Sequence, residues 1–252
     1  MTGTVPGTVL VTGAARRIGA AIARALAADG WRVVLHCHRS GAEAETLAHE
    51  TGAVGIVEAD LGDRAAIDGL IGRAGAWGPL DALVNNAATF SNDGVANVSW
   101  ESLDAHLVPN LAAPLFLSRD FARAFKGQNG NIVNLLDQKV DNLNPDFLSY
   151  TLSKVALAAL TRMLAMALAP RIRVNGVSPG LTLISGKQTE QSFQRAWHDT
   201  PLGRSSTPEE LAAAVRFILL TPSMTGQSLV LDGGESLQNR PRDVAFDPAL
   251  RT

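Results

Sequence analysis

The chain has 252 residues, of which 46% are hydrophobic, and it carries a net charge of −2 with a pI near 6.2. These values predict a single α/β domain over residues 1–252 with a large core. The balanced charge and the 5% aromatic content argue against a nucleic-acid surface. Cys37 is the only cysteine, which excludes an internal disulfide. With no signal-peptide pattern and no apolar run of membrane-spanning length, we expect a cytoplasmic protein that does not bind membranes.

In chain order, short β-type runs alternate with longer helical patterns. The β-type runs are rich in apolar and β-branched residues, as buried parallel strands are, and lie at 8–12, 31–35, 54–57, 82–85, 131–136, 171–177 and 228–231. Helical periodicity occurs at 18–29, 41–51, 63–75, 99–126, 148–168 and 208–220. This alternation predicts a doubly wound, mostly parallel seven-stranded sheet of the Rossmann type, flanked by helices. Two further stretches are polar: 184–201, a candidate substrate loop, and the C-terminal tail 235–252.

The first strand leads into a glycine-containing turn, Thr12-Gly13-Ala14-Ala15-Arg16-Arg17-Ile18-Gly19. Glycine lets the backbone turn tightly beside a pyrophosphate, and the next helix offers free N–H groups to the anion. A plain β–α turn is the alternative. The order of strand, turn and helix favours a dinucleotide site, and the two arginines add positive charge.

The second strand ends in Leu35-His36-Cys37-His38-Arg39-Ser40. An NAD site normally has Asp or Glu here for the ribose hydroxyls. Arg39, with His38 and Ser40 beside it, suits a 2′-phosphate instead. We therefore predict NADPH as the cofactor. The histidines and the cysteine also suggest a metal site, but alternation along a strand points them to opposite faces, and we predict no metal.

Tyr150 and Lys154 lie four residues apart in a helical pattern, which places both side chains on one helix face. The ammonium is expected to favour the tyrosinate and to lower the phenol pKa from its usual value of roughly 10. The pair would then donate a proton near neutral pH. An exposed helix face with no chemistry is the alternative.

Together these motifs resemble the short-chain dehydrogenase/reductase family over nearly the whole chain. Further matching motifs are Ala59-Asp60-Leu61, Asn85-Asn86-Ala87, Asn110, Pro179-Gly180 and Asp232-Gly233-Gly234. The resemblance implies catalytic roles for Asn110, Tyr150 and Lys154. It implies cofactor contacts from Gly13, Arg16, Arg17, Ile18, Gly19, His38, Arg39, Ser40, Asp60, Leu61, Asn86, Ala87, Ala88, Lys154, Pro179, Gly180, Leu181 and Thr182.

Three positions depart from the general family pattern: Arg17 and Ala88 stand where glycines are usual, and Asp137 stands where a catalytic serine is usual. Together with the run at 36–40 and with Phe90, they resemble the pteridine reductase and dihydromonapterin reductase branch. That resemblance implies that Phe90 stacks on a pterin and that Arg17 contacts the pterin or the phosphates. A core aromatic is the alternative for Phe90.

The chemistry of Asp137 supports the same branch. Ketone reduction requires a neutral donor to the developing oxyanion, which an ionised carboxylate would repel. Reduction of a C=N bond requires a proton on nitrogen, and a buried carboxyl with a raised pKa can hydrogen-bond the Tyr150 phenol and relay that proton. We therefore expect Asp137 and Tyr150 to contact the substrate and to act in catalysis. An exposed aspartate capping a turn is the alternative.

The sequence therefore predicts an NADPH-dependent reductase of a pterin-like dihydro heterocycle. The alternatives are an NADPH-dependent carbonyl reductase of unknown substrate and a non-catalytic NADP(H)-binding protein. The segment 148–168 is apolar nearly all round, more than packing on one sheet requires, and the related enzymes are usually tetramers. We therefore expect a homotetramer.

Overall fold

The strands form one parallel sheet in the order β3-β2-β1-β4-β5-β6-β7, so the predicted doubly wound fold is confirmed. The computed structural model describes residues 6–185 and 188–246. Chain connections reverse direction between β1 and β4, and such a switch point opens a ligand crevice at the carboxyl ends of the strands. The strands are β1 (Thr8–Val11), β2 (Arg32–Cys37), β3 (Gly55–Glu58), β4 (Leu80–Asn85), β5 (Gly130–Leu135), β6 (Ile172–Pro179) and β7 (Ser228–Leu231).

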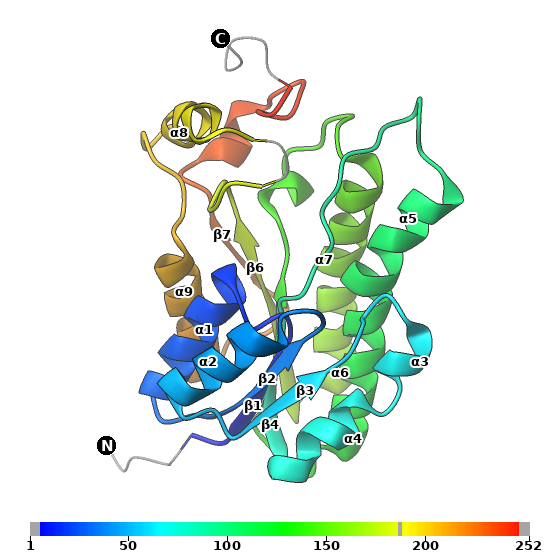
Figure 1. Ribbon diagram of the computed structural model, residues 1–252, viewed down its shortest axis with the longest axis vertical. Coiled ribbons are helices and arrows are strands. Elements are labelled where there is room, and N and C mark those ends of the chain that lie inside the picture. Colours follow the sequence, from blue (N-terminus) through cyan, green and yellow to red (C-terminus); the bar gives the residue numbers. More distant parts are fainter. Residues whose placement is uncertain (1–5, 186–187, 247–252) are drawn as a thin grey trace.

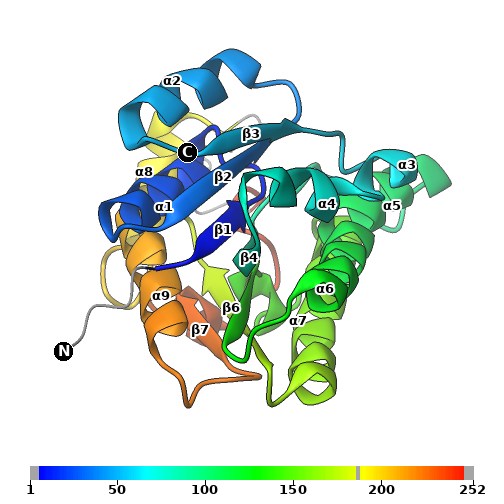
Figure 2. The ribbon, with the colours of Figure 1, turned by 90° about the horizontal axis from the view of Figure 1, so that it is seen from below.

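Helices cover both faces of the sheet, as Figure 2 shows. One layer contains α1 (Arg17–Ala28), α2 (Gly41–Thr51) and α9 (Pro208–Leu220), and the other contains α4 (Leu70–Ala74), α6 (Ala113–Ala124) and α7 (Leu148–Leu168). Alternate residues of β1 enter opposite cores: Val9 and Val11 pack towards the first layer, and Leu10 towards the second. Burial on both faces explains why central strands such as β1 and β5 lack polar alternation.

Two predicted helices are divided in the structure. Gly69, with φ of 78°, separates α3 (Arg64–Ile67) from α4, and η1 (Gly75–Trp77) follows. The predicted helix at 99–126 contains α5 (Trp100–Leu107), the π-helical η2 (Val108–Ala112) and α6. Pro109 has no N–H for an α-helical bond, so the register shifts there.

The candidate substrate loop at 184–201 contains a helix, α8 (Glu190–His198), so the prediction of a loop was wrong for these residues. Thr189 and Ser192 form a capping box, and Phe193 and Ala196 are the buried positions. The capping pattern at Thr189 and the apolar residues Phe193 and Ala196, three positions apart, are the sequence signal that could have identified α8. Residues 186–187 of the same stretch lie outside the described part of the chain.

Helix α7 is long and apolar enough, by length and composition alone, to cross a membrane. By that measure the prediction of no such run was wrong. The helix nevertheless packs beside β6 and α5 in the layer that covers the sheet. Its buried side chains include the polar groups of Ser149, Ser153 and Lys154. This packing is that of a core helix with one uncovered apolar side.

The carboxyl ends of the strands point towards the end of the molecule that carries α8 and the C-terminal segment, at the top of Figure 1. Here β5 continues into η3 (Gln138–Val140), and β7 continues into η4 (Glu235–Gln238). The predicted polar tail at 235–252 is thus partly ordered structure up to residue 246, and residues 247–252 lie outside the described part.

Candidate active site

Asp137 and Tyr150 meet directly at the carboxyl end of β5. The Asp137 Oδ1 atom accepts a hydrogen bond from the Lys139 backbone N–H at 2.9 Å and so caps η3. Its Oδ2 atom accepts from the Tyr150 hydroxyl at 2.6 Å. Tyr150 is in the first turn of α7, which begins just after the loop that follows η3. The exposed turn aspartate considered as an alternative is therefore not what the structure shows.

Burial sets the protonation of this pair. Some of Asp137 is exposed, but its carboxyl is enclosed, and burial raises its pKa while the hydrogen bond from Tyr150 partly offsets the rise. Burial also raises the pKa of Tyr150 well above 10, and the charge on Asp137 raises it further. Tyr150 is consequently a neutral phenol at neutral pH.

Lys154 does not have the electrostatic effect predicted for it. Its ammonium is buried, donates to the Leu135 carbonyl at 2.7 Å and lies 5.7 Å from the centroid of the Tyr150 ring. The prediction that it lowers the phenol pKa was wrong in direction, because burial of the ring and Asp137 outweigh the cation. Burial lowers the pKa of Lys154 to about 8, although Asp137 opposes that change.

Asn110 supports the wall of the site. Its carboxamide accepts from the Thr89 N–H at 2.8 Å and donates to the Thr89 carbonyl at 2.9 Å and to the Ser153 hydroxyl at 3.0 Å. These bonds tie the loop after β4 to α7. The predicted catalytic role of Asn110 stays a prediction, since the contacts described here hold the loop that carries Phe90.

Phe90 faces the site and is not a core aromatic, since 40% of its surface is exposed. Its ring stacks on Phe147, with centroids 4.5 Å apart and planes 21° apart. It also meets the Tyr150 ring edge-on at 4.6 Å. The sequence did not single out Phe147, which adopts φ of 53° immediately before α7. The two phenylalanines form one aromatic wall beside the Asp137–Tyr150 pair.

The glycine turn has the geometry of an anion site. Gly13 adopts φ of 61°, and a Cβ on Gly19 would lie 2.2 Å from the Gly13 carbonyl oxygen, so no larger residue fits there. No side chain caps the N-terminus of α1, where Arg16 is the N-cap residue. Its first N–H groups are thus available to a phosphate. The Asn86 side chain braces the turn by donating to the carbonyl of Thr12 at 2.8 Å.

His36 holds this turn in place, a role that sequence reasoning missed. Its Nδ1 accepts from the Gly13 N–H at 3.1 Å, which leaves Nε2 to donate to the Ala59 carbonyl, also 3.1 Å away. Burial lowers the pKa of His36 to about 4, so the ring is neutral. Both ring nitrogens are used in these bonds. In the part of the chain that the structure describes, no group of three potential metal ligands occurs.

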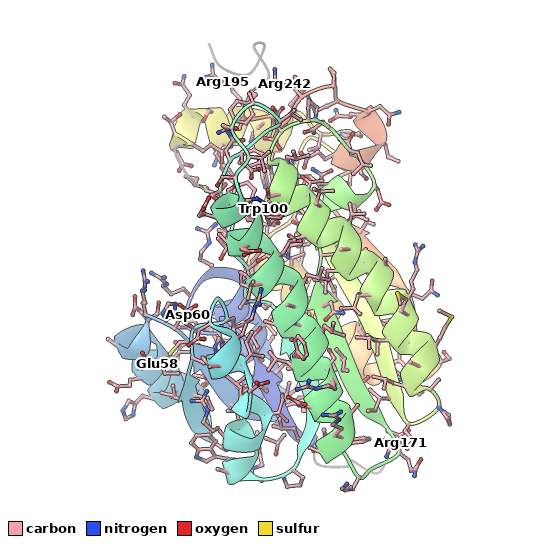
Figure 3. All side chains as sticks on the ribbon, turned by 90° about the vertical axis from the view of Figure 1, so that its right-hand side faces the viewer. Glu58, Asp60, Trp100, Arg171, Arg195 and Arg242 are labelled. Atoms are coloured by element: carbon pink, nitrogen blue, oxygen red, sulfur yellow. The ribbon has the colours of Figure 1, made fainter. Side chains whose placement is uncertain are left out.

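The end of β2 brings together the residues predicted for the 2′-phosphate. Arg39 is exposed, Ser40 is buried as the N-cap of α2, and His38 Nε2 lies 3.5 Å from Asp60 Oδ2. Asp60 also accepts from the Gly62 N–H at 2.8 Å. These residues follow β2 and β3, the two strands on one side of β1 in the sheet. Figure 3 shows Asp60 beside Glu58 of β3.

The segment after β6 lies at the same end of the sheet as the glycine turn and is joined to it by one hydrogen bond. A Cβ on Gly180 would lie 2.7 Å from Asp232 Cα, and Thr182 shares a 2.8 Å hydrogen bond with the Ser206 hydroxyl. The Leu181 N–H donates to Glu235 at 3.3 Å, and Arg17 donates to the Leu183 carbonyl at 3.4 Å. Arg17, with φ of 56°, therefore links the glycine turn to this segment.

The family model described as enoyl-(acyl carrier protein) reductase matches residues 13–236, a region that runs from Gly13 of the glycine turn through the Asp137–Tyr150 pair and β7. The chain belongs to the short-chain dehydrogenase/reductase family. As a short-chain dehydrogenase/reductase it is an oxidoreductase, in agreement with the resemblance noted from its motifs.

Similar proteins include members with different substrates in their names. The structure of FolM alternative dihydrofolate reductase 1 from Brucella canis, complexed with NADP, is 42% identical, with a TM-score of 0.90 over 95% of this chain and 97% of that one. Pteridine reductase 1 of Leishmania tarentolae is 36% identical over 90% of this chain and 96% of its own length. Human L-xylulose reductase is 35% identical over 90% of this chain and 95% of its own length.

Proposed function

We propose that this short-chain reductase uses NADPH to reduce a C=N bond in a pterin-like dihydro heterocycle. The observation that carries the proposal is the 2.6 Å hydrogen bond between the buried Asp137 carboxyl and the Tyr150 phenol. A pair of this kind suits protonation of a nitrogen better than stabilisation of an oxyanion, because a carboxylate beside the phenol opposes negative charge on the substrate. The similarity to pteridine reductase 1 and to FolM alternative dihydrofolate reductase 1 supports this substrate class.

The residues present fit NADPH. The uncapped start of α1 and the glycine turn suit the pyrophosphate, and Arg39 with Ser40 suits the 2′-phosphate. Asp60 and Leu61 would border the adenine, Asn86 to Ala88 the ribose side, and the segment 179–182 the nicotinamide amide. Arg16, Ile18 and His38 complete the proposed cofactor contacts, and Lys154 would bind the nicotinamide ribose. Bound NADPH supplies the hydride for the C=N carbon.

The protein residues supply the proton. In the observed arrangement the Tyr150 phenol donates to Asp137. Once Asp137 is protonated, which its raised pKa favours, it can donate to the phenol oxygen while Tyr150 donates to the substrate nitrogen. Tyr150 is thus the direct donor and Asp137 is the relay. Phe90 offers exposed ring surface on which a planar heterocycle can stack. Arg17, which reaches the Leu183 carbonyl, would border that heterocycle or the phosphates.

A carbonyl reductase is the second candidate, supported by the similarity to L-xylulose reductase. In that case Asp137 would only take the place of a serine, and a ketone would accept its proton from Tyr150. Initial rates of NADPH oxidation across dihydropterins, dihydrofolate, quinonoid pterins and simple ketones distinguish the two. Turnover of ketones without any dihydropterin would overturn the proposal, and absence of all turnover would favour a non-catalytic NADP(H)-binding protein.

We also propose that the enzyme is a homotetramer. Helix α7 exposes Leu152, Met163 and Met166, with 50%, 61% and 75% of their surfaces accessible, and α6 exposes Leu115 and Phe116. Exposed apolar side chains on two helices of one layer are typical of a surface that another subunit covers. Light scattering at micromolar concentration tests this, and a monomer would refute it.

We place the enzyme in the cytoplasm. Cys37 is a free, buried thiol. A chain with a single cysteine cannot form an internal disulfide, so its fold does not require an oxidising compartment. Cell fractionation with a compartment marker is the direct measurement.

A further inference from the structure

The C-terminal segment from Arg242 to Phe246, here called the strap, lies across the loop that joins Asp137 to Tyr150. In Figure 1 this segment, in red, lies above the carboxyl ends of the strands. Figure 3 shows Arg242 at the same end of the molecule as Arg195 of α8, and far from Arg171 just before β6. Nothing in the proposed reaction uses the strap, yet three separate contacts join it to the catalytic loop.

The first contact is a buried ion pair between Lys139 and Asp243. The ammonium lies 2.5 Å from Asp243 Oδ2, and only 5% and 12% of the two side chains are exposed. Lys139 has no well-aligned hydrogen bond at its ammonium, so the contact is chiefly electrostatic. Its backbone N–H is the group that Asp137 caps. The strap therefore holds the residue that orients the Asp137 carboxyl.

The second contact lies at the other end of the loop. Arg242 donates from Nε and from one terminal nitrogen to the two carboxylate oxygens of Asp146, at 2.8 and 2.6 Å. The Asp243 N–H adds a third bond to Asp146 at 2.8 Å. Burial raises the pKa of Asp146, but these bonds outweigh it and the net pKa is lowered. Asp146 directly precedes Phe147, the residue before α7.

The third contact is aromatic. The Phe246 ring lies 5.5 Å from the Phe147 ring, which stacks on Phe90, which in turn meets Tyr150 edge-on. A displacement of the strap would therefore reach both Asp137, through Lys139, and the aromatic wall, through Phe147. Rigid support of this kind is what holds reacting groups in a productive geometry.

We infer that the strap is a positioning element of the active site, which fixes the Asp137–Tyr150 pair and the Phe90 wall by pinning both ends of the loop between them. The inference rests on the proposed function in so far as this pair protonates the substrate. The strap residues themselves touch neither Asp137 nor Tyr150 through any hydrogen bond described above. Lys139 and Phe147 are the residues through which they act.

The charges around the pair give the strap a measurable electrostatic effect. Lys139 and Lys154 face Asp137 from η3 and α7, and Glu235 faces it from η4. Asp243 compensates Lys139, and its negative charge also raises the pKa of Tyr150. Loss of that charge should move the titration of Tyr150 to lower pH. Because Asp243→Glu keeps the charge, comparing it with Asp243→Asn separates this electrostatic effect from a loss of positioning.

Tyr150 is the only tyrosine in the chain, so a tyrosine isotope-labelled at the ring carbon Cζ gives one nuclear magnetic resonance signal from the site itself. We would compare the full-length wild type with Asp243→Asn, which removes the charge, and with Asp243→Glu, which keeps it. Arg242→Gln breaks the second contact at a residue that is half exposed. Arg24→Gln is the matched control, because Arg24 makes a similar two-bonded pair with Glu50 on the surface between α1 and α2.

For Asp243→Asn we expect a changed Cζ shift, a Tyr150 pKa that moves downwards, and a fall in kcat of about ten-fold or more, with the KM for NADPH unchanged. Asp243→Glu, which keeps the charge, should have a Cζ shift and a kcat close to those of the wild type. Arg242→Gln should change the Cζ shift and lower kcat, and Arg24→Gln should change neither. Wild-type values for Cζ and kcat in the folded Arg242→Gln and Asp243→Asn proteins would overturn the inference. The Cζ signal needs no substrate, so it tests the strap even if the enzyme reduces ketones and not dihydropterins.

Discussion

Replacing Asp137 with serine removes the carboxylate oxygen that accepts the Tyr150 hydroxyl at 2.6 Å. A serine side chain has one oxygen on a shorter stem, so it cannot both cap the Lys139 N–H and reach the phenol as the two carboxylate oxygens do. The variant should therefore lose the proton relay and keep the phenol. Because no proposed cofactor contact involves Asp137, NADPH affinity should hardly change.

The size of the effect follows from the geometry. A short hydrogen bond to a buried charged group contributes roughly 1.5–3 kcal/mol. General acid catalysis typically contributes about 100-fold or more, which corresponds to roughly 2.7 kcal/mol in the activation free energy. We therefore expect Asp137→Ser to lower kcat for dihydropterin reduction by about 100-fold. Ketone reduction should survive or improve, because serine restores a neutral donor for an oxyanion.

The assay is NADPH oxidation with a dihydropterin and with a ketone, at saturating NADPH, on the wild type and on three variants. Asp141→Ser is the matched control, since Asp141 is an exposed aspartate of the same loop. Tyr150→Phe should damage both reactions, because either mechanism needs the phenolic proton. If Asp137→Ser turned over dihydropterins at the wild-type rate, the relay would be refuted and Asp137 would be a structural turn residue.

Three further predictions concern the cofactor, the buried acid and the glycine turn. Arg39→Ala should weaken NADPH binding by about ten-fold or more and leave NADH binding nearly unchanged in fluorescence titrations, whereas equal affinities for the two cofactors in the wild type would contradict an NADPH site. Burial raises the folded-state pKa of Glu235 from 4.5 to about 7, so its contribution to stability is full below pH 4.5 and is lost as the pH rises to about 7. Glu235→Gln should remove this loss, so its unfolding free energy should exceed that of the wild type by an amount that grows from pH 4.5 and reaches roughly 3 kcal/mol near pH 7. Denaturant titrations in which both proteins show the same pH dependence would refute this. Gly19→Ala should abolish NADPH binding in a folded protein, because its Cβ would lie 2.2 Å from the Gly13 carbonyl oxygen, and retained affinity would show that the turn can open.

The secondary structure was largely readable from the sequence because its signals are local. Unbroken apolar runs marked strands buried on both faces, and glycine followed by a helix marked the anion turn. The errors occurred where one residue changed the local register, as at Gly69 and Pro109, or where a polar surface pattern hid a cap, as at Thr189. Each of those residues was visible in the sequence, but its effect depends on the backbone conformation that packing selects.

Residue identity alone determined the chemical types in the site: a phenol, an ammonium, an arginine in place of an acid, and a carboxyl in place of a serine. Spacing along one helix also fixed that Tyr150 and Lys154 share a face. The sequence could not give the sign of the pKa changes, since these depend on burial and on neighbours distant in the chain. Burial of the phenol and its contact with Asp137 raise the Tyr150 pKa, although a lysine lies one helical turn away.

Tertiary structure alone decided what surrounds the pair. His36 reaches the glycine turn from β2, and Glu235 reaches Leu181 from beyond β7. Arg242 meets Asp146 across 96 positions of sequence. Contacts of this kind leave no periodic or local trace, because the two partners come together only when the parallel strands place their carboxyl ends at one edge of the sheet. Sequence thus determined which groups do the chemistry, and the assembled sheet determined which of them touch and how each is protonated.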